Sequence, residues 1–201
     1  QIDFFVMSYC PYGKQAEEGI EPVYQLLKAK AIFNPHYVIY EQYAGGAPDY
    51  CIDNGNLCSM HAIPELNQNV RELCVNKYMG IASWFDFALA MNKGCTAANA
   101  DTCWEAVATT LKLDVAKIKT CEKNEAIALL SADKALGDKL GVSGSPAIFI
   151  DGDAYEGGRD PEAYKTALCA KFDTKPSECS TALEGPVAST TAAAAGAGCG
   201  V

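Results

Sequence analysis

The spacing of apolar residues predicts a β-α-β unit at the beginning of the chain. The run IDFFVM (2–7) is apolar except for one aspartate, which is typical of a short buried strand. Apolar residues at helical spacing follow between about 13 and 30 and predict an amphipathic helix. The segment HYVIYEQY (36–43) alternates in polarity and is rich in aromatic and β-branched residues, so it predicts a second strand.

The middle of the chain has a helical pattern. Residues 44–58 are rich in Gly, Pro, Asn and Asp, and we interpret them as a loop. From Pro64 to about Gly141 the pattern predicts helices, with interruptions near Gly94 and at 113–114.

The pattern then returns to strands before a last helix. Short strands are predicted at 146–150 and 154–157, on either side of the turn DGD. A helix is predicted at 159–169, where an Asp-Pro pair at 160–161 suits the N-cap and the first helical position. The order is therefore β-α-β, a helical block, then β-β-α. After Cys179 the sequence consists mostly of small uncharged residues and predicts an extended tail.

The composition restricts the classes of partner and the cellular compartment that we expect. The net charge of −9 argues against nucleic acid and anionic membrane surfaces as partners, and no run of 18 apolar residues predicts a membrane span. Ten cysteines without any CxxC pair favour disulfides, so we expect no metal and no cofactor. Many disulfides predict an extracytoplasmic protein that is secreted, on a cell surface or in a periplasm-type compartment. A start at Gln1 fits a removed signal peptide as well as an arbitrary boundary.

The stretch SYCPYG carries the candidate chemistry. Cys10 lies where the first strand ends and a helix begins, and free N–H groups and the helix dipole stabilise a thiolate there. Pro11 suits the first helical position, and Tyr12 either contacts a peptide substrate or covers the thiol. Gly13 stands where a dithiol enzyme would carry its resolving cysteine. The alternative is that Cys10 is a buried structural cysteine.

A second stretch, GVSGSPAIFIDG (141–152), favours the chemical interpretation. Together with FFVMSYCPYG it resembles the thioredoxin superfamily, and DsbA-like proteins in particular. The resemblance spans residues 1–171 and implies an α/β thioredoxin-like fold (β-α-β, helical insertion, β-β-α). The single-cysteine CPYG motif departs from the family pattern at Gly13. It also implies a cis Pro146 facing Cys10, and a Ser145 backbone that pairs with a bound peptide as an added strand. The insertion, with MHAIPELNQNVRELC, is also similar to the gamma-interferon-inducible lysosomal thiol reductase group.

The predicted organisation has four parts. Residues 1–43 form the N-terminal half of the thioredoxin fold, and 44–140 form a cysteine-rich loop with the helical insertion. Residues 141–171 form the C-terminal half of the fold. Residues 172–201 form the small-residue tail that carries Cys199.

The cysteine spacing suggests four local disulfides, although the sequence alone does not fix the connectivity. Four pairs are predicted: Cys51 with Cys58, Cys74 with Cys95, Cys103 with Cys121, and Cys169 with Cys179. These pairs leave Cys10 and Cys199. Cys199 is surrounded in the sequence by small residues that cannot form a hydrophobic core, so a packing role is not expected. We expect it to form a disulfide outside these four pairs.

Two main hypotheses follow. In the first, the protein has lost dithiol chemistry and is a self-assembling, fibre-forming structural subunit whose tail docks on, or disulfide-links to, a neighbouring subunit through Cys199 and Cys10. In the alternative, Cys10 beside cis-Pro146 makes the protein a monothiol thiol–disulfide oxidoreductase or isomerase acting on peptide or thiol substrates. A peptide-binding chaperone without redox chemistry would use the same groove.

Overall fold

The first strand, β1 (Ile2–Val6), is buried on both sides because it is an inner strand of the sheet. The computed structural model describes residues 1–184 and 198–200. The sheet has the order β2-β1-β5-β6, with β2 (Phe33–Tyr37), β5 (Ala147–Ile150) and β6 (Asp153–Tyr155). β1 runs parallel to β2 and antiparallel to β5, and β5 runs antiparallel to β6.

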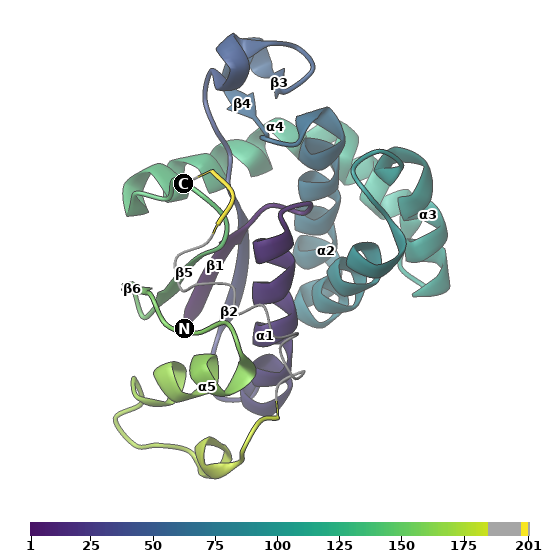
Figure 1. The fold of residues 1–201 in the computed structure, drawn as a ribbon. Coiled ribbons are helices and arrows are strands. Elements are labelled where there is room, and N and C mark those ends of the chain that lie inside the picture. The colour runs from purple at the N-terminus through teal and green to yellow at the C-terminus, as the bar shows by residue number, and fades with distance from the viewer. Residues whose placement is uncertain (185–197, 201) are drawn as a thin grey trace.

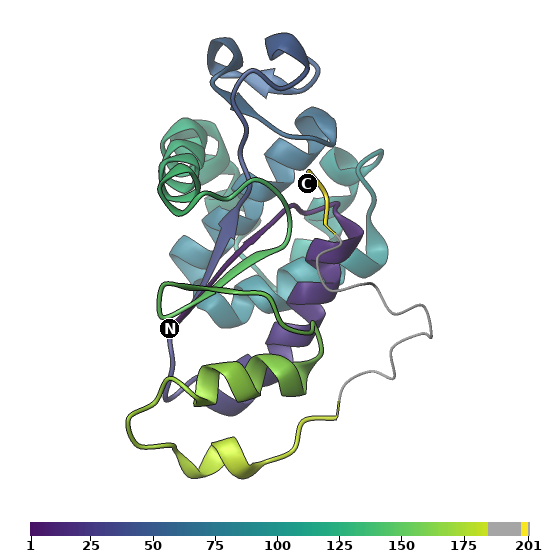
Figure 2. The same cartoon turned by 60° about the vertical axis from the view of Figure 1, so that its left-hand side comes forward.

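Helices cover both faces of the sheet (Figures 1 and 2). Ile2, Phe4 and Val6 belong to the larger core cluster, with α1 (Pro11–Leu27), α2 (Ala62–Gly94) and α5 (Pro161–Cys169). Phe5 belongs to a smaller cluster on the other face, with residues at the end of α4 (Val115–Leu140). Alternate side chains of one strand therefore point into two cores, as expected for period-two alternation.

The segment between the two halves of the sheet consists of a small hairpin and three helices. The hairpin strands are β3 (Cys51–Ile52) and β4 (Leu57–Cys58), and α3 (Ala100–Thr110) lies between α2 and α4 in sequence. α2 bends at Gly80, where φ is +84°. Beyond the bend, Trp84 and Phe85 contact the Phe4 ring, with centroids 5.4 and 6.1 Å away. The inserted helices therefore share one core with the sheet. Single 3₁₀ turns occur at Tyr43–Gly46, Asp53–Gly55 and Ser177–Ser180.

The architecture confirms the predicted α/β thioredoxin-like fold and corrects the position of its second strand. That strand covers 33–37 instead of 36–43, and it includes Pro35. Proline is tolerated here because β2 is an edge strand. The predicted loop 44–58 also contains the β3–β4 hairpin. In the last helix, the Asp160 carboxylate accepts a hydrogen bond from the Ala163 N–H at 2.9 Å, which confirms the predicted N-cap.

All ten cysteines are paired. The predicted pairs Cys51–Cys58 and Cys169–Cys179 are present, whereas the predicted pairs Cys74–Cys95 and Cys103–Cys121 are wrong. The observed bonds are Cys10–Cys199, Cys51–Cys58, Cys74–Cys121, Cys95–Cys103 and Cys169–Cys179. The two errors have one cause: α4 packs along α2, so their cysteines meet, whereas Cys95 and Cys103 close the short turn between α2 and α3.

Part of the predicted tail, namely 185–197 and residue 201, lies outside the described residues. Within residues 1–184 and 198–200, no helix combines the length and apolar character needed to cross a bilayer.

Candidate active site around Cys10

Cys10 is held at the N-terminus of α1, after the short turn 7–9 that follows β1. It is the N-cap residue, and Pro11 follows at the first helical position. The Cys10 N–H donates to the Met7 carbonyl at 3.0 Å, and the Cys10 carbonyl accepts from the Lys14 N–H at 3.0 Å. The Cys10 residue has no exposed surface. Cys10 therefore lies between the first strand and the following helix, as the sequence predicted.

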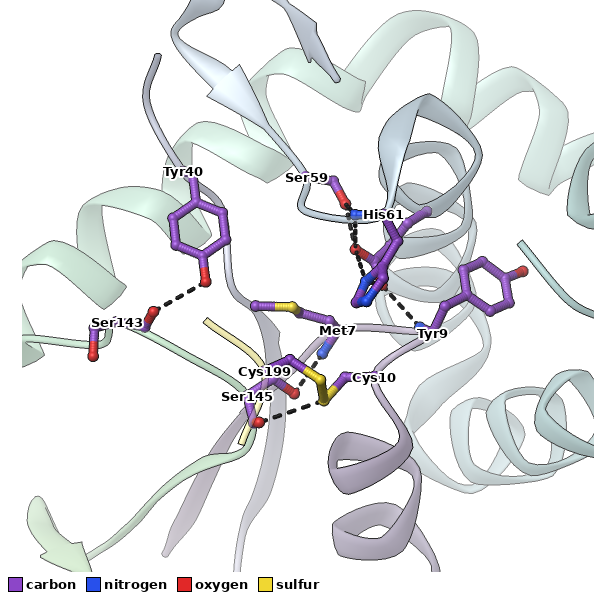
Figure 3. The surroundings of a disulfide bond; sticks show 10 residues. Met7, Tyr9, Cys10, Tyr40, Ser59, His61, Ser143, Ser145 and Cys199 are labelled. Atoms are coloured by element: carbon purple, nitrogen blue, oxygen red, sulfur yellow. Dashed lines mark hydrogen bonds and ion pairs between the residues drawn. A yellow bond between two sulfur atoms is a disulfide. The ribbon is translucent and has the colours of Figure 1, made fainter. Parts of the chain in front are cut away.

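The loop before β5 brings Ser145 and Pro146 to Cys10, across 135 positions of sequence (Figure 3). The Ser145–Pro146 peptide bond is cis. The Ser145 carbonyl oxygen lies 3.4 Å from the Cys10 sulfur, and the Ser145 hydroxyl accepts from the Met7 N–H at 3.0 Å. These contacts fix the cis-proline loop against the turn that precedes the helix.

The end of the same chain occupies the groove beside this loop. Cys199 forms a disulfide with Cys10, with Cα atoms 6.0 Å apart. Its backbone also pairs antiparallel with Ser145, with N···O distances of 2.9 and 2.8 Å. Cys199 is partly exposed, whereas Cys10 is not. A cysteine on an extended strand thus lies where the sequence predicted that a peptide would pair, and here it comes from the protein's own tail.

Gly13 is closed in by the same loop. A Cβ at this position would lie 2.7 Å from the Ser145 hydroxyl oxygen and 3.1 Å from the Met7 carbonyl oxygen. A cysteine at 13 therefore does not fit unless Ser145 moves. Tyr12 is half-buried, and its ring lies beneath the Arg159 guanidinium, 5.1 Å from the ring centroid.

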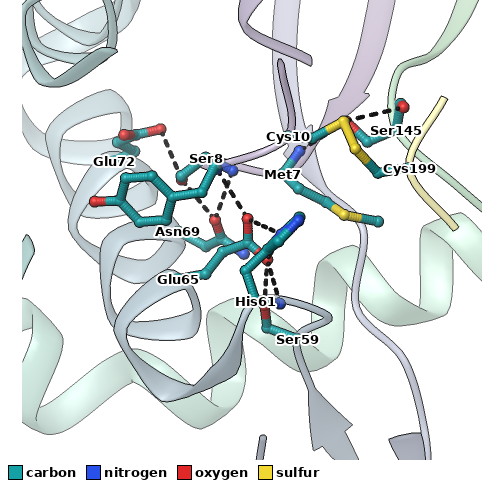
Figure 4. A network of polar contacts seen from close by, with 11 residues as sticks. Met7, Ser8, Cys10, Ser59, His61, Glu65, Asn69, Glu72, Ser145 and Cys199 are labelled. Atoms are coloured by element: carbon teal, nitrogen blue, oxygen red, sulfur yellow. Dashed lines mark hydrogen bonds and ion pairs between the residues drawn. A yellow bond between two sulfur atoms is a disulfide. The ribbon is translucent and has the colours of Figure 1, made fainter. Parts of the chain in front are cut away.

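Polar groups of α2 anchor residues 8 and 9, immediately before Cys10 (Figure 4). The Ser8 hydroxyl donates to the Asn69 side-chain oxygen at 2.6 Å, and the Tyr9 N–H donates to Glu65 at 2.9 Å. His61 contacts the same Glu65 carboxylate through Nδ1 at 2.9 Å, and this hydrogen bond raises the pKa of His61 despite its partial burial. The insertion therefore positions the turn that carries Cys10.

Two further carboxyl groups are buried behind this turn. Burial raises the pKa of Glu72 to about 7, although Tyr37, Gln68 and Ser8 donate hydrogen bonds to it. Burial also raises the pKa of Glu17 on α1 well above its usual value, and Asn92 donates to that carboxyl at 2.5 Å. Sequence reasoning missed both groups. The available signal was the presence of acidic residues within otherwise apolar helix faces.

The structure has a thioredoxin-like fold with a helical insertion and a disulfide at the cysteine that precedes α1. No protein-family model matches the chain, and no curated protein matches it in sequence. Solved structures do match. Reduced DsbA from Mycobacterium tuberculosis is 15% identical and has a TM-score of 0.58, over 87% of this chain and 83% of that one.

Two other similar structures are also described as thiol–disulfide proteins. The reduced disulfide bond oxidoreductase DsbG from Mycobacterium tuberculosis is 15% identical with a TM-score of 0.59, over 88% of this chain and 80% of that one. The cytosolic disulfide reductase DsbM from Pseudomonas aeruginosa, solved with GSH, is 10% identical with a TM-score of 0.54, over 77% and 87%. At these identities the similarity establishes the fold. It gives no support to the fibre-forming structural role that the sequence suggested first.

Proposed function

We propose that this protein carries out thiol–disulfide exchange, with Cys10 as the attacking sulfur and Cys199 as the second sulfur of the redox couple. One observation carries the proposal: Cys10 is bonded to a cysteine that pairs as a strand with Ser145 beside cis-Pro146. The CPYG motif has a single cysteine, and a Cβ at position 13 would lie only 2.7 Å from the Ser145 hydroxyl oxygen. In this proposal the tail supplies the thiol that the motif lacks.

Reduction begins at the sulfur that a reductant can reach. Because Cys199 is partly exposed and Cys10 is buried, an incoming thiolate attacks the Cys199 sulfur. The S–S bond breaks, Cys199 forms a mixed disulfide with the reductant, and Cys10 leaves as the thiolate. The N-terminus of α1 favours this leaving group, since the helix dipole stabilises negative charge there. A second thiolate then releases Cys199, so that two thiols become one disulfide.

The reduced protein reacts in the opposite sense with a substrate disulfide. The Cys10 thiolate attacks one substrate sulfur, a bond forms between them, and the other substrate sulfur leaves as a thiolate. Cys199 then attacks the Cys10 sulfur, releases the second substrate thiolate and restores the Cys10–Cys199 bond. Tail and substrate use the same backbone edge of Ser145, so the tail must leave this edge before the substrate binds.

The compartment is part of the proposal. Five disulfides in 201 residues favour an oxidising, extracytoplasmic location. The similar structures do not decide this, since one of them is described as cytosolic.

The test compares wild type with Cys10→Ser and Cys199→Ser in insulin reduction and in refolding of scrambled ribonuclease. We expect wild type to turn over and Cys10→Ser to be inert. Cys199→Ser should accumulate a mixed disulfide at Cys10, because no thiol within the site releases it. A Cys169→Ser/Cys179→Ser protein serves as the matched control, since it lacks a disulfide outside the couple. Equal activity of wild type and Cys10→Ser would refute the proposal.

A second candidate function is self-association by exchange of the tail between copies. The observation that favours it is that residues 198–200 hold the groove through a disulfide and a two-bond strand pair, contacts that a second copy's tail could make equally well. The test reduces and reoxidises a mixture of unlabelled and ¹⁵N-labelled protein, then maps Cys10–Cys199 peptides. Mixed-isotope peptides together with disulfide-linked multimers support exchange, whereas only same-isotope peptides from a monomer refute it.

A further inference from the structure

Directly after Cys199, Tyr40 and Ser143 leave no space for a side chain on Gly200, although this glycine is itself exposed to solvent. A Cβ on Gly200 would lie 2.0 Å from the Tyr40 hydroxyl oxygen and 3.0 Å from the Ser143 carbonyl oxygen. Gly200 also has a φ of +87°, which glycine adopts far more readily than other residues. Both the space and the backbone therefore require glycine at the position that follows the cysteine.

Tyr40 is fixed in this position from two sides. Its hydroxyl donates to the Ser143 carbonyl at 3.0 Å, across the groove, as Figure 3 shows. Its backbone exchanges two hydrogen bonds with Cys58 of the β3–β4 hairpin, at 3.0 and 2.9 Å. The Tyr43 ring packs against the Tyr40 ring, with centroids 5.5 Å apart. Because of these contacts, the tyrosine cannot easily move aside for a side chain after the cysteine.

The groove is open on the other side of the cysteine. Gly198 lines a cavity of about 550 Å³, together with Pro146, Tyr155 and Arg159. A peptide that pairs with Ser145 in the direction of the tail would place the residue before its cysteine at this cavity. The two sides of the bound cysteine therefore differ in the side-chain volume they accept.

We infer that the site selects extended peptides in which glycine directly follows the reacting cysteine, that it tolerates bulk before the cysteine, and that Tyr40 with Ser143 sets this selection. The inference rests on the proposed thiol–disulfide exchange at Cys10, and it assigns the substrate class as Cys-Gly peptides. The tail, with its sequence Gly-Cys-Gly, is the first member of that class.

The test measures how fast Cys10 captures activated peptides. The full chain carrying Cys199→Ser leaves Cys10 without its partner, and the same serine remains in every variant compared. The peptides are mixed disulfides with thionitrobenzoate, in pairs that differ only in Gly or Ala after the cysteine. The Cys10 thiolate attacks the peptide sulfur, the Cys10–peptide disulfide forms, and the coloured thionitrobenzoate thiolate leaves in equal amount. Rates are normalised to the reaction of each peptide with a small free thiol.

We expect the Gly peptide to react roughly tenfold or more faster than the Ala peptide, a ratio typical of one badly accommodated methyl group. In a Tyr40→Ala background this ratio should fall to about threefold or less. Tyr78→Ala is the matched control: it removes a tyrosine ring of α2 whose hydroxyl contacts Glu125, outside the groove, and should leave the ratio unchanged. Replacing Ala by Trp before the cysteine should change the rate little.

The outcomes distinguish the glycine selection from the proposed thiol–disulfide exchange at Cys10. If Gly and Ala peptides react equally while Cys10 captures both, the selection is wrong and the proposed function stands. If Cys10 captures neither peptide although both react with the free thiol, the proposed function fails. A full Gly preference in Tyr40→Ala would assign the selection to the positive φ and overturn the role of Tyr40.

A second measurement uses the protein's own tail and does not depend on added peptides. The equilibrium between the Cys10–Cys199 bond and dithiothreitol is compared in wild type, Gly200→Ala, Tyr40→Ala and the double variant. We expect Gly200→Ala to lower the equilibrium constant for forming the Cys10–Cys199 bond by roughly tenfold. The decrease should be much smaller when Tyr40 is already alanine. Equal effects of Gly200→Ala in the two backgrounds would contradict the selection by Tyr40.

Discussion

The helical insertion and the rim of the candidate site each contain a long-range disulfide, and the two bonds differ in their surroundings. Cys74 and Cys121 join α2 to α4, and both are buried, at 0 and 1% exposed. Cys10 is equally buried, but its partner Cys199 is partly exposed and lies on a strand held by two backbone hydrogen bonds. The first bond is inside a packed core, whereas the second closes the edge of a groove.

This difference separates a structural cross-link from a bond suited to exchange. Exchange needs a sulfur that an incoming thiolate can reach and a stabilised leaving thiolate. The Cys10–Cys199 bond is suited to both, because Cys199 is a partly exposed residue and Cys10 lies at the N-terminus of α1. Neither cysteine of the α2–α4 bond is accessible without opening the packing between these helices.

The largest expected contrast is in the rate of reduction. Under limiting dithiothreitol, followed by alkylation and peptide mapping, Cys10 and Cys199 should be labelled at least about a hundredfold faster than Cys74 and Cys121. The buried bond must wait for an opening of the α2–α4 contact, which lies at the stable end of local unfolding. Labelling of all four cysteines at one rate would remove the distinction between the two bonds.

The next contrast is in stability. Removal of the α2–α4 bond by Cys74→Ala/Cys121→Ala should lower the free energy of unfolding by about 4 kcal/mol, since the bond spans 47 positions. Chain entropy alone would predict about 5 kcal/mol for the 189-position Cys10–Cys199 span. We expect a smaller loss for Cys10→Ala/Cys199→Ala, because releasing the tail also gives freedom to the folded state. Denaturant melts of both double variants measure this, and a larger loss for the Cys10 pair would contradict it.

Local signals predict most of the element order, with the second strand misplaced and the β3–β4 hairpin missed, whereas the thioredoxin-like fold was predicted from the family resemblance. The apolar run before Cys10, the helical spacing after it and the Asp160 N-cap are all short-range features. The meeting of Cys10 with Ser145 and Pro146 depended on two stretches that resemble one superfamily, and the structure brings those stretches together.

The rest depends on contacts between distant elements, which local spacing does not report. Cys74 pairs with Cys121 because α4 runs along α2, and no pattern within either helix indicates that neighbour. The sequence also left open whether Cys199 bonds in its own chain, because a tail of small residues has reach but no preferred direction. For Gly13, the sequence indicated a missing cysteine, whereas the structure adds the Ser145 hydroxyl that excludes one.

A smaller effect is expected from glycine substitutions in the two regions. Gly13→Ala should destabilise the protein by about 1–2 kcal/mol, because the new methyl displaces the Ser145 hydroxyl from the Met7 N–H. Gly137→Ala in α4 is the matched control: its Cβ would make only ordinary contacts, at 3.6 Å from Phe5 and Val142, and should stabilise the helix by up to about 1 kcal/mol.

A double-mutant cycle then tests the cause. In a Ser145→Ala background the cost of Gly13→Ala should shrink by about 1 kcal/mol, since the clashing oxygen is gone. Thermal or urea melts of the four proteins give the coupling. Additive effects of the two substitutions would mean that the Ser145 hydroxyl does not restrict residue 13.

The smallest expected effect is on the pH dependence of stability. It arises where α4 of the insertion contacts the sheet, away from both disulfides. His36 on β2 contacts Asp133 of α4 at 2.9 Å and Asp3 of β1 at 3.6 Å. Burial by itself would lower the pKa of His36, but the hydrogen bonds with Asp133 and Asp3 outweigh it and raise the pKa to about 9. Burial raises the pKa of Asp133, so the cost of burying this carboxylate offsets part of the stabilisation that the His36 imidazolium provides.

The direction of the pH effect follows from the raised value. The unfolded chain loses the His36 proton near pH 6.5 and the folded protein near pH 9, so the stabilisation is complete below pH 6.5 and is lost as the pH rises to about 9. We expect the free energy of unfolding to fall by about 1–2 kcal/mol across this window, because His36 is partly exposed and solvent screens its ion pairs. His36→Gln should remove this slope, whereas His61→Gln should leave most of it. Urea melts at pH 6 and pH 9.5 measure both, and an unchanged slope in His36→Gln would show that another group titrates at this contact.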